Sequence, residues 1–301
     1  MKPKQIARLL ERYRVTDGDK FKLDKYATDD TAGQIVDQRE ADSLLADGIA
    51  RLAALQSRLY ARNSWRMLVV LQSMDAGGKD GTIRHVLTGV NPQGVQVTAF
   101  KQPGPEELAH DFLWRVHART PPAGMIGIFN RSHYEEVLVC RVHPDLLMHQ
   151  HLPNHREGLS SPPGEKFWRH RLDDIAAFEK YLARQGVVIV KLFLHLSRNE
   201  QKRRFLERID SHDKNWKFSA ADLAERGFWD AYQAATESAI AATAAPHAPW
   251  YVVPADYKWF THLVVVEALV DALAGLDLHY PTLSPEDQSR LEDARRTLEA
   301  E

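Results

Sequence analysis

The residues with the clearest chemical potential form one short loop, Ser73-Met74-Asp75-Ala76-Gly77-Gly78-Lys79-Asp80-Gly81-Thr82, which directly follows an apolar run. Glycines let backbone N–H groups turn inward around phosphate oxygens, a helix that starts there adds its positive end, and a lysine supplies a point charge. Gly78-Lys79 stands where a phosphate-binding loop of the G-x-x-x-x-G-K-[ST] type has these two residues. The loop is therefore predicted to bind phosphate. The alternative is an ordinary glycine-rich turn with a lysine nearby.

This loop departs from that motif at two positions. Ser73 replaces the first glycine, and Asp80 replaces the Ser or Thr that would hold Mg²⁺. A carboxylate also lies inside the loop, at Asp75. Because a carboxylate repels phosphate unless a metal bridges the two, Asp75 suggests Mg²⁺ ligation or positioning of an acceptor.

A second candidate follows the apolar run Met125–Phe129, where Asn130-Arg131 stands. P-loop enzymes often place an acid here that acts on Mg²⁺, whereas this chain has an amide followed at once by an arginine. Arg131 is expected to lie near Lys79, where a guanidinium can bind phosphate through two hydrogen bonds. Ser132 and Glu135 have the spacing of a helix capping box, which is the purely structural alternative for that pair.

A third candidate is the basic stretch at residues 198–217, with seven bases and four acids. Arg204 and Arg208 are one helical turn apart and share a face. Placed over the sheet, such helices would form a lid that closes on phosphate and excludes water. The alternative is a solvated helix with Glu200–Arg204 as an exposed ion pair.

The elements that must position these groups alternate between strands and helices. The apolar runs are near-continuous, as expected of parallel strands covered on both faces, and such a sheet binds ligands beyond the carboxyl ends of its strands. Five strands are predicted: Met67–Gln72, Val95–Phe100, Met125–Phe129, Val187–Leu196 and Trp250–Val253. Helices are predicted at Gln38–Arg62, Asp80–Leu87, Glu106–Arg119, Glu165–Arg184, between Ser197 and Ala242, at Trp259–Leu273 and at Ser284–Glu301.

We therefore expect an α/β chain with an N-terminal extension and helix (1–64), a core (65–275) with a lid at about 198–220, and a tail or helix (276–301). Residues 1–25 show little periodicity and are interpreted as an extension. Arg39, Arg51, Arg58 and Arg62 are expected to face solvent, with a subunit contact as the alternative.

Composition excludes several classes of protein. The chain has 301 residues, and its 39 basic and 41 acidic residues give a net charge of −2, unlike a general nucleic-acid binder. No apolar run approaches a membrane span, and residues 1–10 lack the core of a secretory signal. Cys140 is the single cysteine, which favours a reducing cytoplasm. We expect no nucleic-acid and no membrane partner.

Several aromatic, histidine and cysteine residues are expected to be structural. Trp114, Trp168, Trp229 and Trp259 are interpreted as packing residues, and Cys140 as a small buried side chain. The four histidines at 143, 149, 151 and 155 lack the partners of a zinc site.

In several ordered blocks the chain resembles the family-2 polyphosphate kinases, from about Phe21 to Leu273. The blocks are SMDAGGKDGTIRHV (73–86), PEELAHDFLWRVHARTP (105–121), IGIFNRSHYEEVLVCRV (126–142), FLHLSRNEQKRRFLER (193–208), KNWKFS (214–219) and HAPWYVVPADYKWF (247–260). The resemblance implies a P-loop kinase fold similar to thymidylate kinase, with a five-stranded parallel sheet in an α/β/α sandwich and a helical lid. It also implies Mg²⁺-dependent phosphoryl transfer between inorganic polyphosphate and an adenine nucleotide.

The same resemblance implies roles for particular residues. Asp75, Lys79 and Arg131 would be catalytic, with Asp75 also the metal ligand. Phosphate or polyphosphate would contact Ala76, Gly77, Gly78, Lys79, Asp80, Gly81, Arg84, His85, Arg141, Arg204, Arg208, Lys214 and Lys217. The acceptor nucleotide would contact Lys101, Asp111, Asn130, Arg131 and Glu135.

Asn130 bears on which acceptor is used. Many ADP-using family members carry Asp-Arg where this chain has Asn130-Arg131, and the version with Asn resembles the branch that also accepts AMP. The expected activity is transfer to AMP, ADP or both, by a homodimer or homotetramer. The alternatives are an ADP-only polyphosphate kinase, a conventional NTP-dependent nucleotide kinase, and a silent phosphate-binding scaffold.

Overall fold

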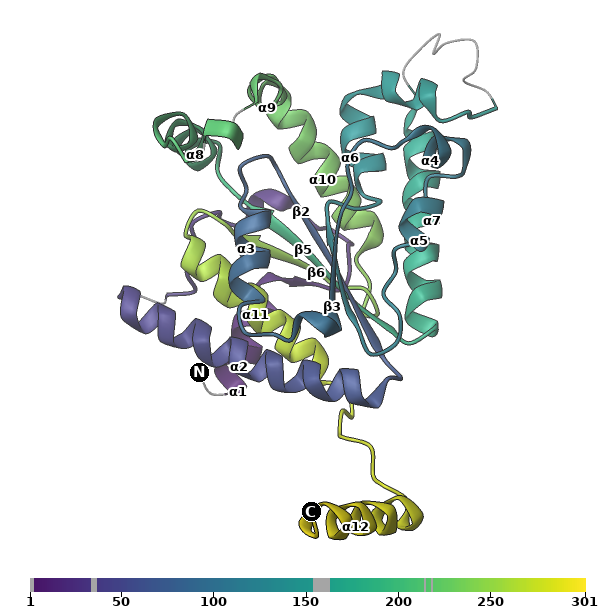
Figure 1. The fold of residues 1–301 in the computed structure, drawn as a ribbon. Helices are drawn as coiled ribbons and strands as arrows, with labels where there is room; N and C mark the ends of the chain where they lie inside the picture. Colours follow the sequence, from purple (N-terminus) through teal and green to yellow (C-terminus); the bar gives the residue numbers. More distant parts are fainter. Residues whose placement is uncertain (1–2, 34–36, 154–162, 214, 218) are drawn as a thin grey trace.

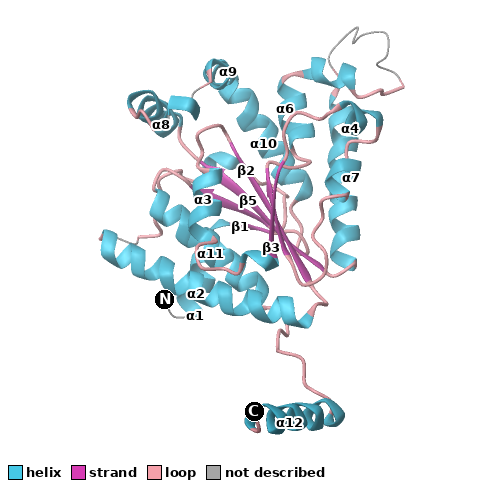
Figure 2. Cartoon of the chain, viewed as in Figure 1, coloured by secondary structure: helices cyan, strands magenta, loops and turns pink. Residues whose placement is uncertain are grey.

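The fold is a six-stranded sheet between two layers of helices, seen in a computed structural model (Figures 1 and 2) that describes residues 3–33, 37–153, 163–213, 215–217 and 219–301. The strand order is β1-β6-β5-β2-β4-β3, with β2 to β6 parallel and β1 antiparallel to β6. The strands are β1 Arg14–Val15, β2 Arg66–Ser73, β3 Val95–Ala99, β4 Ile126–Asn130, β5 Val187–His195 and β6 Trp250–Pro254.

The α/β architecture and the five parallel strands are confirmed, but the expected strand count was one too low. The additional strand, β1, is two residues long, and Arg14 pairs with Tyr251. A strand this short leaves no periodic pattern in the sequence. The segment before it, interpreted as an extension with little periodicity, forms helix α1, whose Leu10 and Tyr13 are buried.

Helices cover both faces of the sheet and its carboxyl edge. Those of eight or more residues in the described chain are α1 Pro3–Tyr13, α2 Gln38–Arg62, α3 Lys79–Val86, α6 Glu135–Val142, α7 Glu165–Arg184, α8 Arg198–Asp210, α10 Trp229–Thr243, α11 Lys258–Ala274 and α12 Pro285–Glu299. The shorter ones are α4 Pro105–Ala109, α5 Trp114–His117, α9 Ala220–Glu225 and the 3₁₀ turns η1 Leu23–Lys25, η2 Pro92–Gly94, η3 Pro144–His149, η4 Asn215–Lys217 and η5 Arg226–Phe228.

One predicted helix is divided in the structure. The expected helix Glu106–Arg119 consists of α4 and α5, because the chain extends at His110 and then turns at Asp111. The Asp111 carboxylate accepts a hydrogen bond from the backbone N–H of Leu113, 2.9 Å away, which stabilises a turn rather than a continuous helix.

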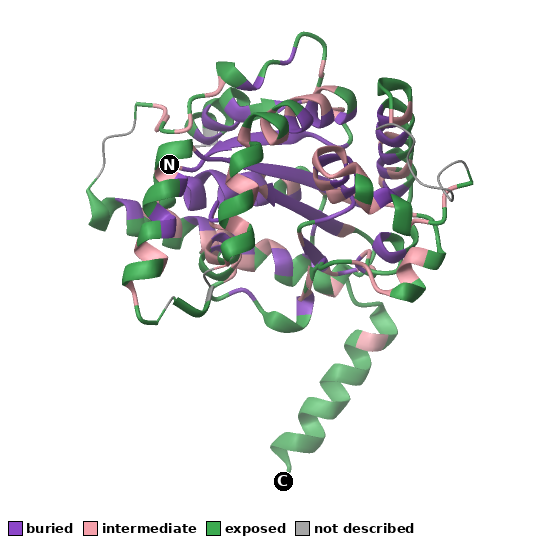
Figure 3. Ribbon diagram, turned by 90° about the horizontal axis from the view of Figure 1, so that it is seen from above, coloured by how far each residue is buried: buried purple, intermediate pink, exposed green. Residues whose placement is uncertain are grey.

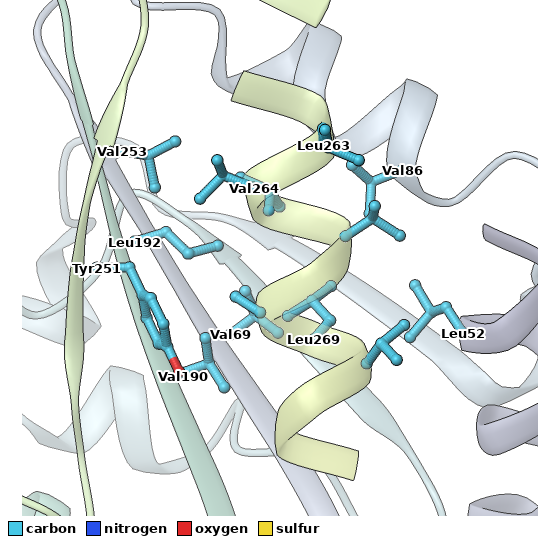
Figure 4. Close-up of a cluster of buried hydrophobic side chains, with 14 of the residues drawn as sticks. Leu52, Val69, Val86, Val190, Leu192, Tyr251, Val253, Leu263, Val264 and Leu269 are labelled. Atoms are coloured by element: carbon cyan, nitrogen blue, oxygen red, sulfur yellow. The ribbon is translucent and has the colours of Figure 1, made fainter. Parts of the chain in front are cut away.

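The two faces of the sheet bury alternate residues of each strand. On β2, Met67, Val69 and Leu71 pack toward α1, α2, α3 and α11, while Leu68 and Val70 pack toward α5, α6, α7 and α10. In Figure 4, α11 lies between strand residues and residues of α2 and α3. The labelled side chains there are Val69, Val190, Leu192, Tyr251 and Val253 of the strands, Leu263, Val264 and Leu269 of α11, Leu52 of α2 and Val86 of α3.

The C-terminal helix α12 stands apart from this body. Figure 3 shows it exposed over nearly its whole length, and it has no buried residue. Cys140 of α6 and Trp168 of α7 are buried in one cluster, as expected. Within the described residues, no helix is both long and apolar enough to cross a membrane.

Candidate active site

The loop after β2, predicted to bind phosphate, contains backbone conformations that favour glycine. Gly78 precedes α3 with a φ of 99°, in the left-handed region that favours glycine. A Cβ atom on Gly77 would lie 2.3 Å from the Ser73 hydroxyl, so only glycine fits there. Ala76 also has a left-handed φ, of 60°, which is uncommon for a residue with a side chain. The sequence therefore folds into the predicted strand–loop–helix arrangement.

Lys79 folds back along this loop toward the end of β2. Its ammonium group donates to the backbone carbonyl and to the hydroxyl of Ser73, each at 3.0 Å. Burial lowers the pKa of Lys79, and this effect is countered by the nearby carboxylate of Asp75. Ser73, which replaces the motif's first glycine, thus supplies a second acceptor for the lysine.

Arg131 meets the loop from the end of β4. Its guanidinium Nη2 lies 3.1 Å from the Asp75 carboxylate, and its backbone has a left-handed φ of 64°. Burial alone would lower the pKa of Arg131, but Glu135 and Asp75 outweigh that effect and raise it. The predicted meeting of Lys79, Asp75 and Arg131 at one edge of the sheet is therefore present.

Asn130 and Glu135 complete this group. The Asn130 amide donates to the Asp80 carboxylate, 2.8 Å away. Burial raises the pKa of Glu135, and the charges of Arg131 and Lys79 partly offset the shift. The capping-box alternative for Ser132 and Glu135 is wrong, because α6 begins at Glu135 itself. The Ser132 hydroxyl instead accepts hydrogen bonds from the Gln72 amide and from the Tyr134 N–H.

The predicted lid starts with α8, above the phosphate loop (Figure 1). Arg204 on α8 is buried, and its guanidinium donates to the Ala76 carbonyl at 3.1 Å and also to the Ala255 carbonyl. The Glu200–Arg204 pair, expected to be exposed if structural, forms at 2.7 Å but is nearly inaccessible to solvent. Arg208 lies 3.6 Å from the carboxylate of Asp222 on α9.

Two residues near the loop were not predicted as site residues. Asp222 faces the charges of Arg208 and Arg131, and both its burial and the nearby Asp75 raise its pKa. Gln201 on α8 donates to the Asp75 carbonyl at 2.9 Å. Asp222 lies outside the sequence blocks named above, and Gln201 lies inside the block 193–208 but was assigned no role there. Each approaches the loop from an element that is distant in sequence.

The remaining candidates contact other groups in the described chain. His85 stacks on His262 with ring centroids 4.6 Å apart. Arg141 pairs with Glu165 at 2.7 Å, and the Lys101 carbonyl accepts from Arg115. Arg84 is exposed on α3. Lys214 lies outside the described residues, as does the side chain of Lys217, whose backbone belongs to η4.

The oxygen ligands near Asp75 fit a Mg²⁺ ion that is shared with substrate phosphates better than a metal ion whose ligands all come from the protein. The described residues contain no cluster of three His, Cys, Asp or Glu side chains that could hold a metal. Mg²⁺ is commonly bound by one or two carboxylates together with substrate phosphates. Asp75 and Asp80, in the predicted phosphate loop and the first turn of α3, provide hard oxygen donors of that kind.

This parallel sheet, its phosphate loop and the cationic residues at its carboxyl edge define a P-loop phosphotransferase of the kinase type. The family model described as Polyphosphate kinase 2 (PPK2) matches residues 35–280, and the chain belongs to that family.

Similar proteins cover nearly the whole chain. An ADP-polyphosphate phosphotransferase from Rhodopseudomonas palustris is 45% identical over 96% of this chain and 98% of its own length. An AMP/ADP-polyphosphate phosphotransferase from Meiothermus ruber is 45% identical over 90% and 96%. The solved structure of polyphosphate kinase 2 from Arthrobacter aurescens TC1 has a TM-score of 0.83 and 39% identity, covering 96% of each chain.

Proposed function

We propose that this protein transfers a phosphoryl group from inorganic polyphosphate to AMP and ADP, with Mg²⁺ as cofactor. The observation that carries the proposal is the convergence of Lys79, Asp75 and Arg131 on one phosphate loop, with Arg131 Nη2 3.1 Å from Asp75. The names of the two relatives at 45% identity support polyphosphate as donor and adenine nucleotides as acceptors.

The chemistry needs positioning more than covalent catalysis. A terminal phosphate oxygen of the nucleotide attacks the terminal phosphorus of polyphosphate, and the bond to the next bridging oxygen breaks. The nucleotide gains one phosphate and the polyphosphate leaves one unit shorter. Because the broken and the formed bonds are both phosphoanhydrides, the reaction is reversible and needs no enzyme-bound intermediate.

The chain's own residues would divide this work. Lys79 and the N–H groups of the loop hold the transferred phosphoryl group, and Arg131 offsets the charge that develops on its oxygens. Asp75 would hold Mg²⁺, which supplies further charge neutralisation when bound. Asn130 and Glu135 would orient the acceptor phosphate beside Arg131.

The location and the assembly are further parts of the proposal. We propose a cytoplasmic enzyme, consistent with a single buried cysteine. We also propose a homodimer or homotetramer, as the family resemblance implies.

Product analysis tests the proposal directly. The purified protein is incubated with Mg²⁺, long-chain polyphosphate and either AMP or ADP, and nucleotides are separated by chromatography. ADP from AMP and ATP from ADP are expected. ATP from ADP alone would exclude AMP as an acceptor, and transfer from ATP but not from polyphosphate would identify a conventional nucleotide kinase.

A further inference from the structure

Two neighbouring carbonyls of the phosphate loop are held by side chains of α8. The Asp75 carbonyl accepts from the Gln201 amide at 2.9 Å, and the Ala76 carbonyl accepts from the Arg204 guanidinium at 3.1 Å. Gln201 and Arg204 are three residues apart, so they lie on the same face of the helix. One face of α8 therefore contacts the back of the loop.

These contacts bear on phosphate binding because the loop uses its backbone. N–H groups can point toward a phosphate only if the carbonyls of the same peptides point away, and buried carbonyls need donors. The left-handed φ of 60° at Ala76 is an unfavourable backbone conformation for a residue with a side chain. The loop conformation is thus one that the surrounding structure must hold.

Gln201 is itself fixed in orientation. Its side chain is 1% exposed, and its amide oxygen accepts from Arg226 Nη1 at 2.8 Å. The same Arg226 nitrogen donates to the Arg198 carbonyl at 2.7 Å. Arg226 begins η5, which directly follows α9, the helix that carries Asp222. A continuous chain of hydrogen bonds therefore runs from η5 through Gln201 to Asp75.

We propose that Gln201 is a positioning residue for the phosphoryl donor: oriented by Arg226, it holds the carbonyl of Asp75 so that the N–H of the same peptide, which belongs to Ala76, faces phosphate. The inference rests on the proposed function, because it concerns the same phosphate site. It also assigns a function to the hydrogen bonds between η5, which follows α9, and the loop. A shift of Arg226 would reorient the Gln201 amide and so change its hydrogen bond to the Asp75 carbonyl.

Equilibrium binding of tripolyphosphate, measured by calorimetry with Mg²⁺ and no nucleotide, tests this role. Gln201→Met keeps the length of the side chain and removes its donor. We expect about ten-fold weaker binding, the effect of losing one hydrogen bond to a buried carbonyl. Arg226→Met should weaken binding in the same direction. The double variant should lose no more than Gln201→Met, because Arg226 acts through Gln201.

Gln56→Met is the matched control, because Gln56 is an equally buried glutamine on α2. Its tripolyphosphate affinity should stay within two-fold of the wild type. AMP binding without polyphosphate should change less than two-fold in Gln201→Met, and in turnover the KM for polyphosphate should rise more than the KM for AMP. Thermal unfolding of each variant checks that it is folded. Because Arg226 is only partly buried, Arg226→Met tests the hydrogen bond between Arg226 and Gln201 even if Gln201→Met does not fold.

Three results would overturn the role of Gln201: tripolyphosphate binding within two-fold of wild type, equal losses of AMP and tripolyphosphate affinity, or additive losses in the double variant. Failure of the proposed function gives a different result. In that case the wild-type protein would bind tripolyphosphate and yet transfer no phosphate from polyphosphate to a nucleotide.

Discussion

The side-chain amide of Asn130 donates a hydrogen bond to the carboxylate of Asp80 across 2.8 Å, which joins the end of β4 to the first turn of α3. An amide satisfies this carboxylate without adding charge. A carboxylate at position 130 would place two negative groups at hydrogen-bond distance, and they would then need a proton or a shared cation. The residue at 130 therefore sets the local charge where the acceptor phosphate is expected.

We predict that Asn130→Asp lowers the preference for AMP relative to ADP. The added negative charge changes the relative affinity for the acceptor phosphates of AMP and ADP, and it raises the Mg²⁺ concentration that is needed for transfer. Steady-state kcat/KM values for AMP and ADP, at saturating polyphosphate and several Mg²⁺ concentrations, give the ratio. Asn63→Asp, at the distant end of α2, is the control. An unchanged AMP-to-ADP ratio in Asn130→Asp would count against the assignment.

Replacing Lys79 by methionine should reduce phosphoryl transfer by about 10²–10³-fold, the effect of removing one preorganised charge from a transition state. The fold should persist, because burial already disfavours the charged form of this lysine. Initial rates and thermal unfolding are measured side by side. Lys180→Met, at an exposed position on α7, should retain the wild-type rate. Near-normal transfer by Lys79→Met would refute a role for the loop in catalysis.

Acidic pH should destabilise the fold through two buried histidines. Burial lowers the pKa of His195 to about 4, and burial and the charge of His85 lower that of His262 to about 4. In the unfolded chain both titrate near 6.5. Between pH 6.5 and 4 the unfolded state binds more protons, so stability falls as pH falls through that window.

His195→Gln isolates one of these contributions. The imidazole Nδ1 of His195 is buried without a hydrogen-bond partner among the described residues. The loss of unfolding free energy between pH 7 and pH 5, measured in urea, should shrink by about 2 kcal/mol in this variant. His212→Gln, at an exposed position, should leave the loss unchanged. Equal pH dependence in His195→Gln and wild type would contradict the role of burial.

Arg51→Met should destabilise the protein by about 2 kcal/mol, because it leaves the carboxylate of Glu267 buried without its partner. Arg51 Nη1 lies 3.1 Å from Glu267, whose side chain is 1% exposed. Arg58→Met, exposed on the same helix, should cost far less. Urea unfolding compares the two variants. The added substitution Glu267→Leu should recover much of the loss, and equal stabilities of Arg51→Met and Arg58→Met would disprove the assignment.

The sequence alone was enough to predict the central part of the candidate site. Lys79 follows β2 and Arg131 follows β4, and parallel strands bring such residues to the same edge of a sheet. The glycines of the loop permit the backbone conformation that it adopts, such as the left-handed φ of Gly78. Spacing along the chain therefore predicted that Lys79, Asp75 and Arg131 meet.

Contacts between distant elements could not be predicted in this way. Arg51 was predicted to face solvent, and this prediction is wrong, because Arg51 pairs with Glu267. The packing of α2 on α11, which brings the two residues together, leaves no local pattern in the sequence. Asp222 and Gln201 reach the loop from helices whose placement depends on the whole connection between β5 and β6. Arg204 was expected to bind phosphate, and that role stays a prediction, since its guanidinium contacts the loop's backbone.

The pairing of Arg14 with Tyr251 joins positions 237 residues apart in the chain. During synthesis Arg14 is made long before Tyr251, its partner in the sheet. The pairing of β1 with the edge of β6 can therefore form only after most of the polypeptide has left the ribosome. Because the paired residues are so far apart in sequence, this pairing is a late folding event. Until then the N-terminal segment is available to pair with another chain's edge, so refolding yield should fall with protein concentration.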